Sequence, residues 1–274
     1  MDQDWADSLT ASKAKLSRDD PSPVIVANPR GSSPYLLLGD HAGREIPRAL
    51  GDLGLPPEAM DRHIAWDIGV AALGERLAAA LDAAFIRQRY SRLVIDCNRR
   101  LGDPTSVPTV SDGQIVPGNR GLGPAGLAAR QARVFNPYHA EIARVLDRRM
   151  AAGRTTVIIA LHSFTPVMEG FTRPWRYGVL HRDDSPFSRR VLGALRSRLG
   201  DAAGDNQPYA MDGTDNTVPL HADGRGLDYL ELEVRQDLIA DADGQEAEAA
   251  FIAGVFAELA PGIGDGRRPV TPAV

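Results

Sequence analysis

Two of the six histidines in this sequence stand where short apolar runs end, and this position suggests metal chemistry. The run 35–39 is followed by Asp40 and His41, and the run 156–161 is followed directly by His162. Two neutral imidazoles and a carboxylate are ordinary ligands of catalytic Zn²⁺, which keeps a fourth position for water. A single histidine beside a strand is more often a hydrogen-bonded structural residue, so the prediction of a metal site rests on the pair.

Short, continuously apolar runs are typical of buried strands in a parallel sheet, and they predict the elements that carry these histidines. The expected strands are 35–39, 93–95, 156–161 and 177–180, and a loose alternation of apolar and polar residues predicts a fifth strand over 227–234. Apolar spacings of three and four residues predict helices over 68–81, from Val134 to about Gly153, over 186–199 and over 245–259. This alternation indicates an α/β fold with a mostly parallel or mixed central sheet and helices on both faces. The Gly-, Pro- and Ser-rich stretch 100–126 is expected to be a long functional loop.

Open α/β sheets bind ligands beyond the carboxyl ends of their strands. The predicted strands bring six polar residues to that edge: His41, Glu45, Asn98, Arg99, His162 and Glu233. Simpler interpretations stay open for two carboxylates of the region. Glu45 stands on a turn before Pro47 and could be a surface residue, and Asp67 stands where the N-cap of the helix 68–81 is expected.

The composition sets limits on the class of protein. The chain has 274 residues, of which 43% are hydrophobic and 24% charged, as in an ordinary globular protein. With 31 Lys and Arg against 36 Asp and Glu, the net charge of −5 gives no basic field for nucleic acid. The single cysteine, Cys97, excludes an internal disulfide. No membrane span or secretory signal is recognisable, which predicts a cytoplasmic protein. The oligomeric state stays open.

Residues 1–24 are polar and without a clear period, so we expect an N-terminal tail or a surface helix there. Residues 25–274 are long enough for one core, and we expect them to form a single α/β domain.

Four motifs, taken in order, resemble the N-formylglutamate amidohydrolase family over about residues 34–240. They are Asp40-His-Ala-Gly-Arg-Glu-Ile-Pro47, Tyr90-Ser-Arg-Leu-Val-Ile-Asp-Cys-Asn-Arg99, Leu161-His-Ser-Phe-Thr-Pro166 and Glu233-Val-Arg-Gln-Asp-Leu238. That family is similar to the zinc carboxypeptidases, so the resemblance implies a zinc-carboxypeptidase-like fold and a metal-dependent hydrolytic domain. The implied substrate is a small N-acyl amino acid with carboxylates, such as N-formylglutamate, and the implied setting is amino-acid catabolism.

The resemblance also implies roles for particular residues. His41 and His162 would bind Zn²⁺ or another divalent metal. Asn98 and Arg99 would hold the substrate carboxylate. Glu233 would be the general base.

The carboxylate ligand of the metal stays open between two residues. The carboxypeptidases place a glutamate three residues after the first histidine, whereas this chain has Arg44 there and Glu45 one position later. We prefer Glu45, because the turn could bring it inward, and Asp67 is the alternative.

Four arginines near the predicted edge are further candidates. Arg92 or Arg235 would stabilise the negative charge that develops on the substrate. Arg173 and Arg176 would meet a second substrate carboxylate, or they would simply stack on Trp175.

Two other functions remain compatible with the sequence. A zinc peptidase or deacylase could use the same metal on another carboxylated amide. A non-catalytic anion-binding protein could use the same scaffold, and the shifted position of Glu45 favours it.

Overall fold

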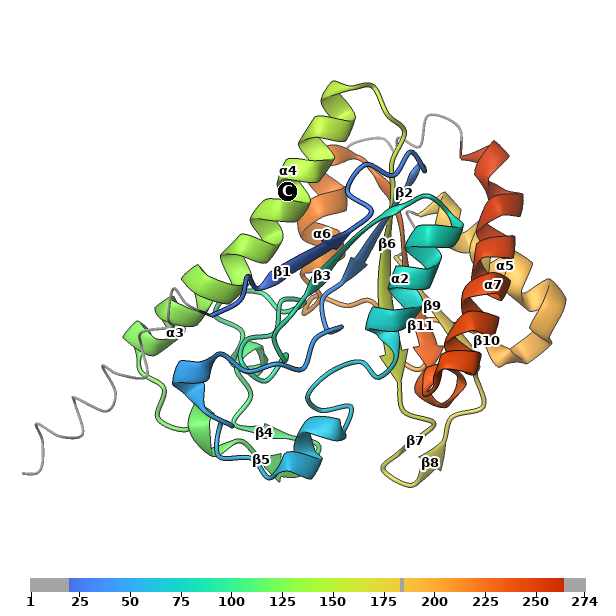
Figure 1. The fold of residues 1–274 in the computed structure, drawn as a ribbon. Coiled ribbons are helices and arrows are strands. Elements are labelled where there is room, and N and C mark those ends of the chain that lie inside the picture. Colours follow the sequence, from blue (N-terminus) through green and yellow to red (C-terminus); the bar gives the residue numbers. More distant parts are fainter. Residues whose placement is uncertain (1–19, 183–184, 264–274) are drawn as a thin grey trace, which may run out of the picture.

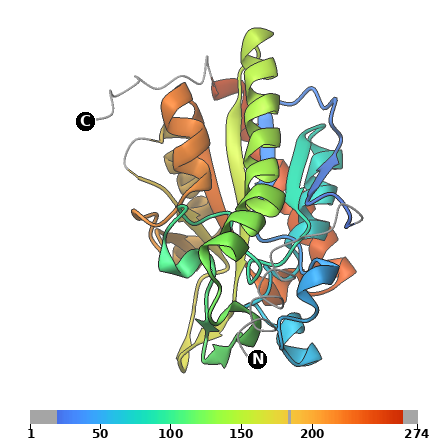
Figure 2. The same ribbon diagram turned by 90° about the vertical axis from the view of Figure 1, so that its left-hand side faces the viewer.

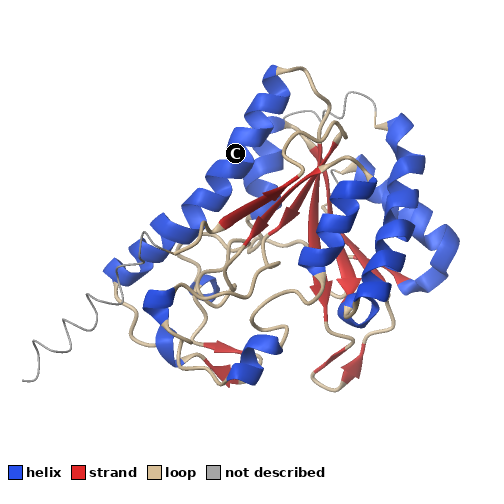
Figure 3. Cartoon of the chain, viewed as in Figure 1, coloured by secondary structure: helices blue, strands red, loops and turns tan. Residues whose placement is uncertain are grey.

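A seven-stranded mixed sheet forms the centre of the fold in the computed structural model, which describes residues 20–182 and 185–263. Its strands are β1 (Val24–Ala27), β2 (Tyr35–Gly39), β3 (Ala84–Gln88), β6 (Val157–Phe164), β9 (Tyr177–Leu180), β10 (Ala203–Asp205) and β11 (Asp228–Arg235). They lie in the order β1-β3-β2-β6-β11-β9-β10. The inner strands β3, β2, β6 and β11 run parallel, whereas β1 and β9 pair antiparallel with β3 and β11. Figure 3 shows these strands between the helices.

Helices cover both faces of the sheet, as predicted (Figure 1). On one face lie α2 (Val70–Ala80), α5 (Pro186–Leu199) and α7 (Ala242–Leu259). On the other lie α4 (Asn136–Ala151) and α6 (Thr217–Ala222), which Figure 2 shows from the front. A π-helical turn, Gln131–Phe135, joins α4 to α3 (Pro124–Arg130). None of the helices in the described part of the chain is both long and apolar enough to cross a bilayer.

Small elements complete the chain. Two hairpins form sheets of their own, β4 (Val110–Ser111) with β5 (Gln114–Ile115), and β7 (Val167–Met168) with β8 (Phe171–Thr172). Short 3-10 helices lie at Arg48–Leu50, Pro57–Asp61, Pro104–Ser106, Pro117–Asn119, Gly200–Ala202, Asp223–Arg225, Gln236–Ile239 and Ala260–Gly262.

The buried strands have two apolar faces, each packed on its own layer of helices. In β2, Leu36 and Leu38 pack with α4 and α6, while Tyr35 and Leu37 pack with α2, α5 and α7. Successive side chains of a strand point to opposite faces. The polar residues of β6 and β11 therefore have a defined side: His162, Glu231 and Glu233 share the face that packs against α4 and α6.

The predicted strand 93–95 is wrong, because this segment forms a turn and the strand before it is β3. The three residues are nonetheless fully buried in the core beside α4. Side chains from distant segments donate the hydrogen bonds that the backbone carbonyls here would accept from a neighbouring strand. Asn119 donates to the Leu93 carbonyl at 2.9 Å, and Arg130 donates to the Val94 carbonyl at 2.8 Å. Short apolar runs thus report burial and not the backbone conformation.

The stretch 100–126, predicted as a loop, carries the β4–β5 hairpin and two 3-10 helices before α3 begins at Pro124. The strands β1, β3 and β10 and the helices α3 and α6 were not predicted from the sequence. These elements are only three to seven residues long, and so short a segment has little periodicity to detect.

Residues 1–19 and 264–274 lie outside the described residues, so the predicted N-terminal tail can be followed only from Asp20. Its last residues contact the domain. Arg89 donates to the Ser22 carbonyl at 2.8 Å, and Tyr90 donates to the Pro21 carbonyl at 2.6 Å. Val24, the last residue of the predicted tail, is the first residue of β1. The division of the chain at residue 24 stays a prediction.

Candidate active site

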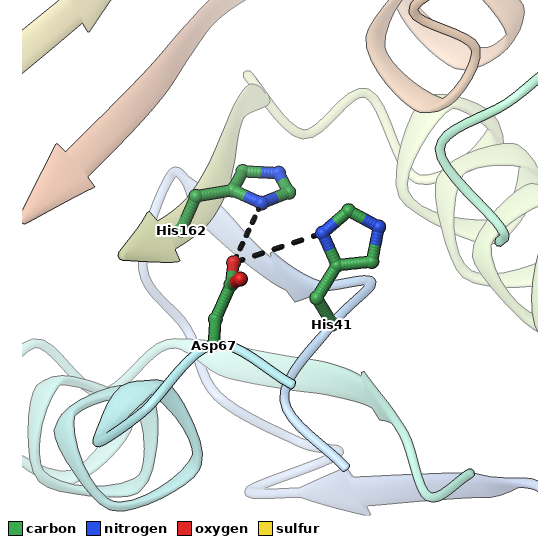
Figure 4. Close-up of side chains that lie close together, drawn as sticks. All are labelled: His41, Asp67 and His162. Atoms are coloured by element: carbon green, nitrogen blue, oxygen red, sulfur yellow. Dashed lines mark hydrogen bonds and ion pairs between the residues drawn. The ribbon is translucent and has the colours of Figure 1, made fainter. Parts of the chain in front are cut away.

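Three buried side chains from distant parts of the chain converge at one edge of the sheet (Figure 4). His162 Nδ1 lies 2.9 Å from Asp67 Oδ2, and His41 Nδ1 lies 3.7 Å from the same oxygen. The two imidazole rings are 5.0 Å apart between centroids. One ligand atom from each residue lies within 4.8 Å of the others. The histidines are therefore close enough to share one ion, as the sequence analysis expects.

The sheet and its turns explain this convergence. His41 follows β2, and its carbonyl accepts a hydrogen bond from the Asp67 backbone at 2.8 Å. His162 is the sixth residue of β6, the strand next to β2. Asp67 is further fixed because the Ser163 backbone donates to its Oδ2 at 3.2 Å. Main-chain contacts thus hold the three elements together independently of any ion.

Asp67 does not cap the helix that follows it, as the sequence suggested. The N-cap of α2 is Gly69, which has a left-handed conformation with φ of 83°, and no side chain caps the helix there. A Cβ at position 69 would lie 2.2 Å from the Ile239 carbonyl oxygen, so only glycine fits this turn. The turn leaves the Asp67 carboxylate free to face the two histidines.

Each of the two imidazoles faces a second carboxylate with its other nitrogen. His41 Nε2 lies 2.7 Å from Asp96 Oδ1, and His162 Nε2 lies 3.7 Å from Asp40 Oδ2. A carboxylate at Nε2 favours the tautomer with the proton there and leaves the Nδ1 lone pair for a metal. Both Nδ1 atoms are also the ones that face Asp67. This arrangement is typical of metal-binding histidines.

The charge state of His41 suits a ligand as well. Burial, assisted by the nearby Arg92 guanidinium, lowers the pKa of His41 to about 4, so the ring is neutral at pH 7. Its Nδ1 is buried without a hydrogen-bond partner in the described part of the protein. A buried nitrogen without a partner is costly unless something binds it. The donor set of two neutral imidazoles and one carboxylate therefore fits a divalent metal such as Zn²⁺.

Glu233 lies beside this cluster because of the register between β11 and β6. It pairs across the two parallel strands with His162, and both side chains point to the same face. Burial raises the pKa of Glu233 above its usual value, while the neighbouring His162 and Arg92 oppose that rise. Its Oε2 is buried and unpartnered among the described residues. A carboxylate so placed is suited to accept a proton.

A cavity of about 400 Å³ opens in front of these residues. Its lining includes His41, Asp67, His162, Glu231, Glu233, Arg92, Asn98, Arg99 and Asp215 from the sheet edge and the neighbouring loops. The two hairpins border it, through Ser111 and Asp112 of one and Met168 of the other. This volume suits a small molecule.

Asn98 and Arg99 both line the cavity, but their side chains already have partners. Asn98 Oδ1 accepts from the backbone of Asn216 at 3.1 Å and of Thr217 at 2.9 Å. Arg99 donates to the Asn98 carbonyl at 2.9 Å and lies 3.5 Å from Asp215 Oδ1. Asn98 thus connects its loop to the start of α6. The Asn98 amide also donates to Asp215 Oδ1 at 3.4 Å. Arg99 has the larger number of donors left for a ligand, since a guanidinium carries five N–H groups.

The other predicted arginines are placed differently. Arg92 lines the cavity and forms an ion pair with Asp67. Arg173 lies just behind the wall, with its guanidinium 4.8 Å from the ring of Tyr209, which lines the cavity. Arg235 pairs with Asp237 at 2.7 Å, and Arg176 pairs with Glu248 at 2.8 Å. Neither Arg235 nor Arg176 lines the cavity.

The structure does not bring Glu45 to the histidines. Its side chain is 53% exposed and lies 2.8 Å from Arg89 Nη1. The Glu45 backbone pairs with the segment after β3, since its N–H donates to the Arg89 carbonyl and its carbonyl accepts from Ser91. Those two hydrogen bonds hold the turn, so it cannot bring the side chain inward. The preference for Glu45 over Asp67 is corrected accordingly.

Four acidic residues of the site received no role from the sequence. Asp40 and Asp96 stood inside the quoted motifs, and their position beside His41 and Asn98 was a usable signal. Glu231 stands two residues before Glu233, so the strand period alone places it on the same face. Asp215 comes from a loop with no recognisable pattern, and only the fold brings it to the cavity.

Comparisons with known proteins agree with the geometry. The family model for N-formylglutamate amidohydrolase matches residues 33–240. The crystal structure of gene product Atu2144 from Agrobacterium tumefaciens is similar, with 34% identity and a TM-score of 0.86 over 90% of this chain and 98% of that one. N-formylglutamate amidohydrolase from Ralstonia eutropha JMP134 is similar in fold, with 20% identity and a TM-score of 0.68 over 89% and 98% of the two chains.

No curated protein matches the sequence significantly. The family model covers most of the chain, including every residue of the buried cluster and Glu233. The predicted resemblance is confirmed: the chain belongs to the N-formylglutamate amidohydrolase family, a family of hydrolases that act on non-peptide amides.

Proposed function

We propose that this amidohydrolase is metal-dependent and cleaves the amide of a small N-acyl amino acid with carboxylates, N-formylglutamate being the first candidate. The observation that carries the proposal is the convergence of His41, Asp67 and His162 directly beside Glu233. This arrangement joins a donor set for a divalent cation to a buried proton acceptor.

Asp67 and the two histidines would hold the metal through Asp67 Oδ2 and the two Nδ1 atoms, which already face one another. When bound, a Zn²⁺ ion polarises a carbonyl and lowers the pKa of a water to about 7. The carboxylate of Asp96 would hold a proton on the far nitrogen of the His41 ring. We propose Zn²⁺ as this metal.

Glu233 is the proposed general base. An amide resists hydrolysis because the attack creates an oxyanion and because the amine must leave protonated. Glu233 would accept the proton of the attacking water and give it to the departing nitrogen. Its burial supports this role, since a carboxylate shielded from bulk water holds a proton more readily than an exposed one.

Three arginines have proposed roles toward the substrate. Arg92 lies next to Asp67 and would stabilise the charge that develops on the acyl oxygen. Arg99 would bind a substrate carboxylate through its remaining donors, and its loop is held by Asn98. Arg173 does not line the cavity but lies against Tyr209, which does, and its charge would favour a second carboxylate there. Arg235 and Glu45 have no proposed role, because their side chains pair with Asp237 and Arg89 away from the cavity.

The proposal is tested by measuring release of the acyl group from a small panel of substrates. We expect formate from N-formylglutamate, slower release from N-acetyl and uncharged N-formyl amino acids, and no cleavage of peptides. Removal of the metal with a chelator should abolish the activity, and added Zn²⁺ should restore it. Full activity of the metal-free protein would refute the metal dependence. Preferred cleavage of a peptide would favour the peptidase alternative. The absence of any turnover would favour an anion-binding protein.

Replacement of Arg99 with Lys should lower kcat/KM about 10-fold or more on carboxylated substrates and much less on uncharged amides. A lysine keeps the charge but cannot make the forked contact of a guanidinium. The ratio of the two kcat/KM values is the measurement. Arg176→Lys is the matched control, because Arg176 pairs with Glu248 outside the cavity. Equal losses on both substrate classes would remove Arg99 from carboxylate binding.

A cytoplasmic location and the likeness to zinc carboxypeptidases remain predictions from the sequence.

A further inference from the structure

Asp40 is a buried carboxylate that no step of the proposed reaction uses. It follows β2 directly, and only 1% of its surface is exposed. It does not line the cavity, so it cannot touch a substrate there. Neither of its oxygens has a hydrogen-bond partner among the residues that the structure describes.

Its counterpart at the other imidazole is fully engaged. Asp96 Oδ1 lies 2.7 Å from His41 Nε2 and also accepts from the Asn98 backbone at 2.8 Å. Burial alone would raise the pKa of Asp96, yet His41 and Arg99 hold it below its usual value. The two histidines are therefore supported unequally, with one carboxylate in contact and the other at 3.7 Å.

Three buried polar groups from different elements meet around Asp40, and none of them makes a hydrogen bond of normal geometry in the described chain. They are the Asp40 carboxylate, His162 Nε2 on β6 and the hydroxyl of Tyr138 on α4. The Tyr138 hydroxyl lies close enough to Asp40 for a hydrogen-bonding contact, and burial followed by this carboxylate raises the pKa of the phenol well above its usual value. A buried charge without hydrogen bonds is costly, so such groups are retained where they have a task.

We propose that Asp40 and Tyr138 are positioning residues that hold the ring of His162. Asp40 accepts a hydrogen bond from His162 Nε2–H, and the Tyr138 hydroxyl donates to the same carboxylate. A small side-chain movement suffices, because the present separation of 3.7 Å exceeds a normal hydrogen bond of about 2.8 Å by only a little. With the proton held at Nε2, Nδ1 is kept available for the metal.

This inference rests on the proposed metal site. A positioning residue can be told from a purely structural one by the stability of the metal-free protein. A residue that only stabilises the fold lowers the stability of the metal-free protein when it is replaced. Burial of the Asp40 carboxylate opposes folding, so loss of its charge should leave the metal-free protein equally stable or more stable.

The test compares Asp40→Asn, Tyr138→Phe and the control Asp228→Asn with the unchanged protein. Asp228 is a buried carboxylate at the opposite end of β11, where Ser185 and Phe187 donate to it. We would measure the Zn²⁺ dissociation constant by competition with a chromophoric chelator, and thermal unfolding without metal. The tautomer of His162 in the metal-free protein would be followed by nitrogen NMR.

We expect Asp40→Asn to weaken Zn²⁺ binding about 10- to 100-fold, the usual effect of removing such a partner. Tyr138→Phe should weaken it less, and Asp228→Asn should leave it unchanged. His162 should lose its preference for the Nε2–H tautomer in Asp40→Asn. Wild-type Zn²⁺ affinity together with an unchanged tautomer in Asp40→Asn would overturn the inference, as would an equal loss in the control. If the unchanged protein binds no Zn²⁺, the proposed function fails first.

Discussion

Replacement of Glu233 with Gln should lower kcat by about 10²- to 10⁴-fold, the contribution usual for a positioned general base. Glutamine has nearly the shape of glutamate but cannot accept a proton at neutral pH. Glu233 points to the same face as His162 and is not among the three residues that would hold the metal. The metal content should therefore stay near that of the unchanged protein. Initial rates of formate release and metal analysis of the same sample are the two measurements.

Glu248→Gln is the matched control for this variant. Glu248 is also a buried glutamate, but it lies on α7, on the opposite face of the sheet, and bonds to Arg176. We expect it to change stability more than kcat. A Glu233→Gln protein that keeps most of its activity would remove Glu233 as the base. If the metal were lost as well, Glu233 would be a ligand and its role would have to be assigned again.

Replacement of Asp67 with Asn should weaken metal binding by more than about 100-fold. Loss of a residue that only hydrogen-bonds to a metal ligand already lowers metal affinity about 10- to 100-fold, and Asp67 is a proposed ligand itself. An asparagine keeps the size of the side chain but supplies no charged oxygen between the two imidazoles. Activity should fall in parallel and recover in part at high Zn²⁺ concentration. Metal affinity and formate release against added Zn²⁺ would be measured together.

Glu45→Gln is the paired variant, since both carboxylates were candidates in the sequence. The Glu45 side chain is exposed and forms an ion pair with Arg89, and such a pair contributes little to stability in water. We expect metal affinity and kcat within about twofold of the unchanged protein. The reverse result, with metal lost on changing Glu45 and kept on changing Asp67, would contradict the site described above.

The parts of the fold that were predictable share a strong apolar pattern. β2, β9 and the first part of β6 are buried on both faces and form continuous apolar runs, whereas β11 shows a loose alternation of apolar and acidic residues. The order of strands and helices indicated the α/β class. The error at 93–95 arose because a core segment can be apolar without being a strand. There, Asn119 and Arg130 from distant segments satisfy the backbone, and no local pattern announces such contacts.

The candidate site was predictable to a similar extent. His41 and His162 were found because each follows an apolar run that predicts a strand, and Glu233 was found through the family motif Glu233-Val-Arg-Gln-Asp-Leu238. Between Glu45 and Asp67 the sequence was misleading. Which of the two carboxylates reaches the histidines depends on two features. The backbone hydrogen bonds of Glu45 hold its turn in place, and the left-handed conformation of Gly69 turns the chain before α2. Both are tertiary contacts, so residue types and spacing could not decide between them.

The candidate reactive residues lie at one edge of the central sheet, whereas two separate hairpins border the cavity, and this separation would allow members of the family to differ in substrate. Within the described residues β4 pairs with β5 alone and β7 with β8 alone, and Val110 and Phe171 on these hairpins are exposed. Loops of this kind accept exchange and insertion more readily than the scaffold that carries them. Swapping either hairpin would reshape the entrance while β6 and β11 keep the reactive groups in register, so new acyl groups could be admitted without rebuilding the chemistry.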